Sequence, residues 1–167
     1  TSGNQSAGSP RSNSEEITGG VTLTSVFADG EELNEGDLEE GPSYRVDGTL
    51  LELRPSLPVE EGDTLELEIG WEVTLPQNGS GRMGHSDHEM YFVAYWFPKM
   101  AVFDDLRLWD AEPYLGNAEF YDGFADYTVA LTVPVGWTVM ATGSLENSEE
   151  VFSALTLDRL EEAAVSD

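Results

Sequence analysis

The sequence predicts a mostly β fold, either an antiparallel β-sandwich or a saddle-shaped sheet, with one short C-terminal helix. Apolar and polar residues alternate strictly over residues 64–75, which is the pattern of a strand with one buried face. Short β-prone runs recur along the rest of the chain between turns rich in Gly and Pro. Helical spacing of apolar residues is confined to the C-terminal part, near residues 156–164.

The composition is that of a folded but very acidic chain. Its 167 residues are enough for one domain with its own core, and 40% of them are hydrophobic. The 33 acidic residues outnumber 7 basic ones, for a formal net charge of -26, which predicts a heavily solvated surface. Such a surface repels phosphate groups, so we expect no nucleic-acid partner. We also expect no membrane span, because no apolar run is long enough.

The N-terminal residues differ in composition from the rest. Residues 1–19 are rich in Ser, Gly and Asn and predict a flexible linker. Residues 20–167 then form the β domain. A tether of this kind before an acidic domain is typical of exported bacterial proteins, so we expect a periplasmic, cell-surface or secreted location. Cysteine is absent, which leaves the compartment open.

The first half of the chain predicts four strands. The first alternates Val21 and Leu23 with Thr22 and Thr24, and Asp29-Gly30 then provides a turn signal. An acidic loop follows, and Pro55 later breaks the pattern. The predicted strands are residues 21–27, 44–46, 50–53 and 64–75, and the predicted loops are 31–42 and 76–84.

The run at residues 64–75 has the clearest periodicity. Leu67, Ile69, Trp71 and Val73 share one face, while glutamates and threonines occupy the other. We expect these four side chains to be buried in a central or near-central strand about 40 Å long.

The second half holds most of the aromatic residues. A strand-like run reaches Trp96-Phe97, and a turn-rich segment follows it. Two further strands are predicted at residues 128–133 and 137–142, joined at 134–136. Thr156 is the expected N-cap of the C-terminal helix, with Asp158 in its first turn.

The order of motifs in this half resembles the N-terminal β domain of the aminopeptidase N family, the thermolysin-like zinc aminopeptidases. The resemblance spans roughly residues 20–167 and is closest to a bacterial branch of the family. The preceding L-P-x-x-x-G-D segment at residues 57–63 also resembles the family, upstream of its long strand. The motifs are Trp96-Phe97-Pro98-Lys99, Pro113-Tyr114-Leu115-Gly116, Glu119-Phe120-Tyr121, Asp126-Tyr127-Thr128-Val129 and Val139-Met140-Ala141-Thr142-Gly143-Ser144-Leu145.

The resemblance implies a non-catalytic domain of a zinc-dependent aminopeptidase. The family's H-E-x-x-H motif, which binds zinc, and its G-A-M-E-N segment are not in this sequence, and both belong to the catalytic domain that follows. We therefore expect no cofactor in this chain and zinc in the catalytic domain. The expected partners are that catalytic domain and a peptide substrate at the edge of its cleft. Because the family's β domain continues further, we expect residues 20–167 to be truncated at the C-terminal end.

The resemblance also implies a substrate contact at Tyr95 and Trp96. In the family, this domain contributes a polar residue, often Gln or Glu, that helps to hold the substrate's amino terminus. The corresponding position here, just before the W-F-P motif, is Tyr95. Tyrosine can donate or accept a hydrogen bond but carries no carboxylate, so Tyr95 could instead be an ordinary strand residue.

Two groups of polar residues suggest other chemistry. His85-Ser86-Asp87-His88-Glu89 could contribute metal ligands, or it could be a polar loop before a strand. Asp104-Asp105 with Glu119 could be paired carboxylates of a glycosidase, or turn and capping residues.

The aromatic residues support a second candidate function, a free-standing β-sandwich that binds carbohydrate or protein. Trp96, Trp109, Tyr114 and Tyr121 could stack on sugar rings, or they could form a core cluster. The segment 95–121 is apolar but interrupted by Pro and Gly, so we expect it to cross a sheet edge and expose an apolar patch.

Overall fold

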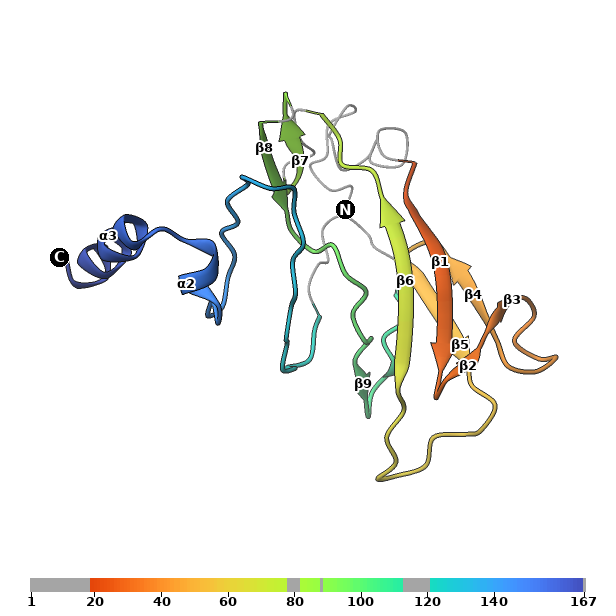
Figure 1. Cartoon of the computed structure of the whole chain (residues 1–167). Coiled ribbons are helices and arrows are strands. Elements are labelled where there is room, and N and C mark those ends of the chain that lie inside the picture. Colours follow the sequence, from red (N-terminus) through yellow and green to blue (C-terminus); the bar gives the residue numbers. More distant parts are fainter. Residues whose placement is uncertain (1–18, 78–81, 88, 113–120, 167) are drawn as a thin grey trace, which may run out of the picture. The chain divides into compact units, whose positions relative to one another are not determined.

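A computed structural model of the chain describes residues 19–77, 82–87, 89–112 and 121–166 (Figure 1). The chain divides into two compact units, residues 1–124 and residues 125–167. The first unit contains all ten described strands and the second contains both described helices. The mostly β class with a short C-terminal helix is confirmed. The expected linker lies outside the described residues except for Gly19.

The first sheet has the strand order β2-β1-β6 and is antiparallel throughout. Strand β1 (Val21–Ala28) confirms the first predicted strand, and the turn at Asp29-Gly30 leads into β2 (Glu31–Glu32). Strand β6 (Leu67–Val73) pairs with the whole length of β1, from Val21 opposite Val73 to Ala28 opposite Leu67. The alternation of β-prone and polar residues in both strands thus produces one ladder.

The β1–β6 ladder contains one irregularity. The register shifts between Leu23 and Ser25, so that Ser25 faces Gly70 and Thr24 is the extra residue. A Cβ atom at Gly70 would lie 2.5 Å from Thr24 Oγ1 and 2.6 Å from Ser25 Oγ. The bulge therefore requires glycine at position 70, because both hydroxyls occupy the space of a side chain.

Strand β6 differs from the prediction in length and position. It has seven residues rather than the predicted twelve of 64–75, which shortens it to about 23 Å. It is an edge strand of its sheet, and no described residue pairs with its outer side, so the expected central position is wrong. The alternation itself is confirmed, since Glu68 and Glu72 are exposed. The expected burial is not, because the four apolar side chains of the other face are only half-buried; they are Leu67, Ile69, Trp71 and Val73.

The second sheet has the order β3-β4-β5. Strands β4 (Ser43–Asp47) and β5 (Leu50–Arg54) form an antiparallel hairpin and confirm two predicted strands. Arg45 and Glu52 face each other in this register and form a 2.8 Å ion pair. Strand β3 (Asn34–Glu35) runs parallel to β4, so the predicted acidic loop contains two short strands, β2 and β3.

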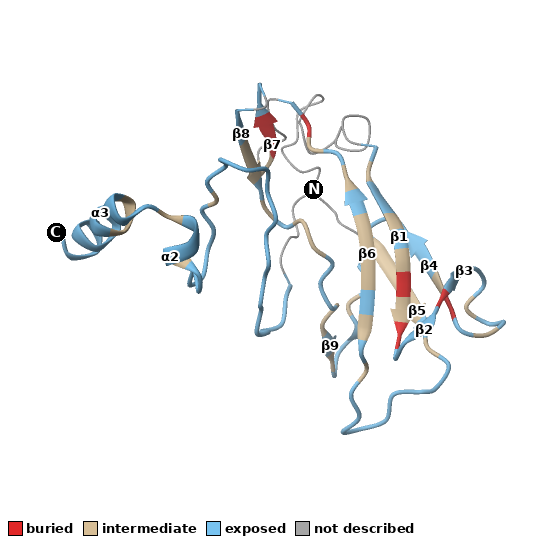
Figure 2. Ribbon diagram, in the orientation of Figure 1, coloured by how far each residue is buried: buried red, intermediate tan, exposed pale blue. Residues whose placement is uncertain are grey.

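The core of the first unit lies between these two sheets (Figure 2). Val26, Ala28 and Leu33 are each at most 4% exposed, and they form its centre. Side chains from both sheets pack against them, which is the arrangement of a small β-sandwich. The packing residues are Leu23, Tyr44, Leu53, Leu65 and Leu67.

Two small hairpins complete the first unit. Strands β7 (Met83–Ser86) and β8 (Met90–Val93) pair in antiparallel register, and so do β9 (Phe103–Asp104) and β10 (Leu108–Trp109). Two expectations need correction here. The predicted loop 76–84 runs into β7, and the strand expected to reach Trp96-Phe97 ends at Val93.

The second unit lacks the two strands expected in it. Residues 121–147, all described, are neither helix nor strand, so the strands predicted at 128–133 and 137–142 are wrong. An alternating pattern indicates which faces of a strand would be apolar, but a strand also needs a neighbour for its backbone hydrogen bonds. The N–H of Trp137 donates to the carbonyl of Pro134 at 3.2 Å, which closes the turn at 135–136.

The second unit ends in helices α2 (Ser148–Val151) and α3 (Ala154–Val165). Helix α3 confirms the predicted C-terminal helix, but its N-cap is Ser153 rather than Thr156. The Ser153 hydroxyl accepts the N–H of Thr156 at 3.2 Å while its own backbone stays extended, as capping requires. Thr156 is therefore inside the first turn. The sequence did not predict α2.

Candidate functional site

Tyr95 is the residue on which the candidate site is built. It comes two residues after strand β8, and its φ of 56° puts a bulky side chain in the left-handed region. That conformation costs roughly 1–3 kcal/mol and ends the strand, so Tyr95 is not the strand residue of the alternative interpretation. The side chain is 56% exposed. The backbone thus turns an aromatic ring towards solvent at the end of a hairpin.

Two cations lie over this ring. Arg82 Cζ is 5.5 Å and Lys99 Nζ is 5.4 Å from the ring centroid of Tyr95. Both distances are within the range of cation–π attraction, worth about 0.5–1 kcal/mol each at exposed sites. The register explains the first contact, because Met83 pairs with Val93 and brings the residues just outside the hairpin together.

Lys99 also binds a carboxylate of the chain. Its Nζ lies 2.5 Å from Oδ2 of Asp122, the residue that directly follows the Glu119-Phe120-Tyr121 motif in the sequence. The two side chains are 30% and 37% exposed, so water and salt screen this ion pair. Tyr95, its two cations and Asp122 form what we call the Tyr95 cluster.

Trp96, the second expected contact residue, is half-buried beside strand β6. Its carbonyl accepts a 3.0 Å hydrogen bond from Nε1 of Trp71, and the two rings lie 6.0 Å apart. The ring of Phe97 meets Trp96 edge-on at 5.4 Å. Trp96 therefore anchors the aromatic segment to the first sheet, and the neighbouring Tyr95 is the more exposed of the two expected contacts.

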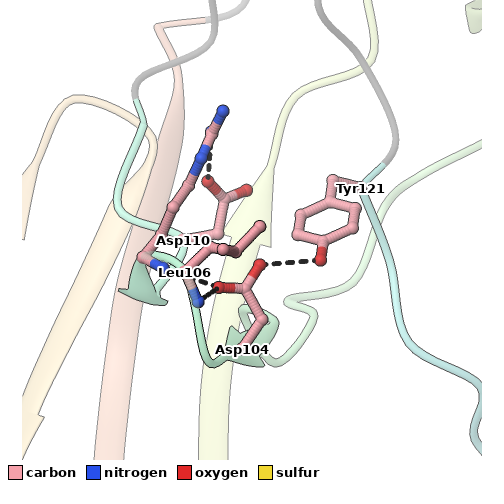
Figure 3. A network of polar contacts seen from close by, with 5 residues as sticks. Asp104, Leu106, Asp110 and Tyr121 are labelled. Carbon is pink, nitrogen blue, oxygen red and sulfur yellow. Dashed lines mark hydrogen bonds and ion pairs between the residues drawn. The ribbon is translucent and has the colours of Figure 1, made fainter.

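A polar network organises the β9–β10 hairpin (Figure 3). Oδ1 of Asp104 accepts the backbone N–H groups of Leu106 at 2.9 Å and Arg107 at 2.7 Å, and Oδ2 accepts the Tyr121 hydroxyl at 2.9 Å. The N–H of Arg107 and the Tyr121 hydroxyl lower the pKa of the Asp104 carboxyl, and the bond to Asp104 raises the pKa of Tyr121. Asp104 is thus a turn residue, and Glu119, the other carboxylate of the glycosidase hypothesis, lies outside the described residues.

The same hairpin exposes apolar side chains. An open hollow of about 520 Å³ lies beside it, lined by Arg107, Trp109, Asp110, Ala111 and Glu112. Phe103 and Trp109 touch edge-on, with ring centroids 5.0 Å apart and planes at 67°. Several apolar side chains within 95–121 are individually exposed. Those that the structure describes are Tyr95, Met100, Phe103, Leu106, Leu108, Trp109 and Tyr121.

The described residues of the histidine group lie in two parts of the β7–β8 hairpin: His85 and Ser86 are in strand β7, and Asp87 and Glu89 are in the turn. His85 is 8% exposed within β7, with its ring 5.3 Å from that of its cross-strand partner Tyr91. Its burial in a strand corrects the expected polar loop. His88 lies outside the described residues, and so do Tyr114 and Glu119. Among the residues that the structure describes, no group of three or more His, Asp or Glu side chains could hold a metal ion.

Sequence analysis did not single out the residues that surround Tyr95. Arg82 lies in the predicted loop 76–84, and Asp122 follows the E-F-Y motif but is not part of any motif. The scarcity of basic residues could have drawn attention to Arg82 and Lys99, which are two of only 7 in the chain.

The second unit carries a long exposed segment without charge. No charged residue occurs between Asp126 and Glu146, and we call residues 127–145 the uncharged segment. Its exposed apolar side chains are Tyr127, Val129, Leu131, Val133, Val135, Trp137, Met140 and Leu145.

In the described part of the chain, no helix has the length and apolar character needed to cross a bilayer. Comparisons with protein-family models, curated proteins and solved structures gave no match.

Proposed function

We propose that residues 20–167 act as the non-catalytic N-terminal domain of a zinc metallo-aminopeptidase. The domain docks on the catalytic domain of the same parent protein and forms one side of its peptide cleft. The zinc ion belongs to that catalytic domain. The proposal starts from the motif order of residues 91–147, and the observation that carries it is the exposure of the uncharged segment.

The uncharged segment is unusual in this chain. Water solvates charged groups well, and a chain with a net charge of -26 has many of them to place on its surface. Instead, residues 127–145 combine β-branched and aromatic side chains that are mostly exposed. Contiguous apolar surface of this kind marks sites of protein–protein contact. We infer that the catalytic domain covers it.

The backbone of the segment supports the same inference. The alternation of Val129, Leu131 and Val133 is suitable for a strand, yet these residues belong to none of the described strands. A segment of this kind can add to a neighbouring sheet edge as a strand, through its backbone N–H and C=O groups. Docking would therefore supply both hydrogen bonds and apolar cover.

The Tyr95 cluster supports the part of the proposal that concerns the cleft. A strained, half-exposed aromatic residue with two cations is costly to maintain for stability alone, and strain of this kind concentrates at functional sites. It occurs at the position where the family places its substrate contact.

The alternative, a carbohydrate-binding module, has less support. A sugar platform needs aromatic faces that lie roughly in one plane. The pairs Phe103–Trp109 and Trp96–Phe97 instead cross at 67° and 80°. The exposed aromatic residues of the β9–β10 hairpin are better suited to burial against protein.

The first test is the reading frame that encodes the chain. An H-E-x-x-H motif downstream of Asp167, followed by a glutamate, is expected. A frame that continues without it, or that ends, would reject the assignment.

The second test measures docking between this chain and the segment that carries the motif, by isothermal titration calorimetry. Leu131→Glu should weaken binding by about tenfold or more, because it puts a charge in the covered surface. Leu57→Glu is the matched control, since Leu57 is 76% exposed and belongs to the first unit and not to the uncharged segment. Equal affinities of the two variants would show that the uncharged segment is not the interface.

A further inference from the structure

Basic residues are scarce in this chain, which has 7 of them and a formal net charge of -26. A surface with this charge repels anions in general. An anion is therefore bound most readily where two cations lie close together.

The Tyr95 cluster holds two cations at one ring. Arg82 Cζ at 5.5 Å and Lys99 Nζ at 5.4 Å from the centroid bring a planar guanidinium and an ammonium group to the same phenol. The ring reduces the repulsion between the two cations, because its negative face attracts each of them. The hairpin places Arg82, and the turn after Tyr95 places Lys99, so the arrangement is determined by the backbone.

The chemistry of this arrangement is selective. A guanidinium, an ammonium and a phenol hydroxyl can all donate hydrogen bonds to a carboxylate. The free amine of a peptide would meet two like charges instead. At this substrate-contact position, the cluster therefore favours a carboxylate of the peptide over its amino terminus.

A carboxylate of the chain already occupies part of the cluster. Asp122 Oδ2 lies 2.5 Å from Lys99 Nζ, and both side chains are about one third exposed. This ion pair shows that a carboxylate can reach the cluster. It also means that Asp122 would compete with any carboxylate that arrives from outside.

We propose that Arg82, Tyr95 and Lys99 form a carboxylate-binding site that receives an acidic side chain of a peptide. If the domain lines a peptide cleft, as the proposed function holds, this site selects substrates with an acidic side chain. Binding of a carboxylate by these three residues does not depend on that function.

The test uses the full chain and two peptides, acetyl-Ala-Glu-Ala-amide and acetyl-Ala-Gln-Ala-amide, titrated at low salt. Binding is followed by NMR shifts of the backbone amides of residues 82–99. The Glu peptide should shift these amides, and the Gln peptide should not. Equal shifts with both peptides, or none with either, would overturn the proposal.

Two variants with opposite expected effects on the affinity for the Glu peptide test the site itself. Arg82→Gln with Lys99→Gln should abolish binding of the Glu peptide. Asp122→Asn should strengthen it by roughly two- to fivefold, the size of an exposed ion pair, because a competing carboxylate is removed. Arg159→Gln removes a positive charge from helix α3 and should leave the affinity unchanged.

Asp122→Asn keeps the proposal testable even if the double variant fails to fold. An unchanged or weaker affinity in Asp122→Asn would show that the cluster is only a structural contact. Failure of docking with intact peptide binding would reject the proposed function alone, whereas intact docking without peptide binding would reject this inference alone.

Discussion

The Tyr121 hydroxyl donates a 2.9 Å hydrogen bond to Oδ2 of Asp104, across 17 positions of sequence. The same carboxylate uses its other oxygen to close the turn before β10. Asp104 therefore links the β9–β10 hairpin to Tyr121, the last residue of the Glu119-Phe120-Tyr121 motif. This contact determines several measurable properties of the first unit.

Tyr121→Phe should raise the pKa of Asp104 towards its ordinary value of about 3.9, because one of the hydrogen bonds that favour its charged form is lost. The measurement is a carbon-detected NMR titration of the Asp104 carboxyl. Asp105→Asn, at the neighbouring position, is the control and should leave the titration of Asp104 where it was. An unchanged Asp104 pKa in Tyr121→Phe would mean that the hydroxyl contact is absent in solution.

The pH dependence of stability should follow from the same pair. The lowered Asp104 pKa contributes stability that is present above about pH 4 and is lost as pH falls through the folded-state pKa. The raised Tyr121 pKa contributes stability that is present below about pH 10 and is lost as pH rises through its folded-state value. Urea unfolding of wild type and Tyr121→Phe across pH should therefore differ most between these limits, and a constant difference beyond them would contradict this assignment.

Gly70→Ala should destabilise the first unit by about 1–3 kcal/mol, the usual cost of overpacking. Its Cβ would come within 2.5 Å of Thr24 Oγ1, and the short side chains of Thr24 and Ser25 can move away only by changing rotamer against the bulge. Chemical denaturation measures the change. Gly36→Ala is the matched control, because no atom lies within 4 Å of its added Cβ, and it should be neutral or slightly stabilising. Equal effects at both positions would argue against the bulge.

Added salt should raise the melting temperature of the chain. At a net charge of -26, self-repulsion opposes the compact state, and ions screen it. Calorimetry between low and roughly molar ionic strength should show a rise that is the same in NaCl and KCl, because screening depends on ionic strength. A flat or falling curve would indicate that the acidic residues are too dispersed to matter.

The purified chain should not hydrolyse aminoacyl chromogenic substrates, with or without added zinc. A catalytic zinc site needs three protein ligands around an open position, and the sequence has no H-E-x-x-H motif to begin one. The assay compares release of the chromophore with and without a chelator. Turnover that the chelator abolishes would reject the assignment of this chain as a non-catalytic domain.

The local pattern of the sequence was sufficient for much of the fold. Alternation predicted β1 and β6, and helical spacing predicted α3, because both periodicities report which side of a segment faces a core. Short β-prone runs predicted β4 and β5. The alternation of 128–133 is as regular as that of β1, yet only β1 found a partner. Pairing depends on a second segment distant in sequence, and no local pattern contains it.

The candidate site divides in the same way. The sequence by itself determined that Tyr95 precedes the W-F-P motif, that positive charge is scarce, and that residues 127–145 carry no charge. Only the tertiary structure decided that Arg82 and Lys99 lie over the Tyr95 ring and that Asp122 binds Lys99. The reason is physical: composition and order are properties of the chain, whereas a contact between residues 13 or 23 positions apart requires a hairpin register and a turn that bring their side chains within a few ångströms.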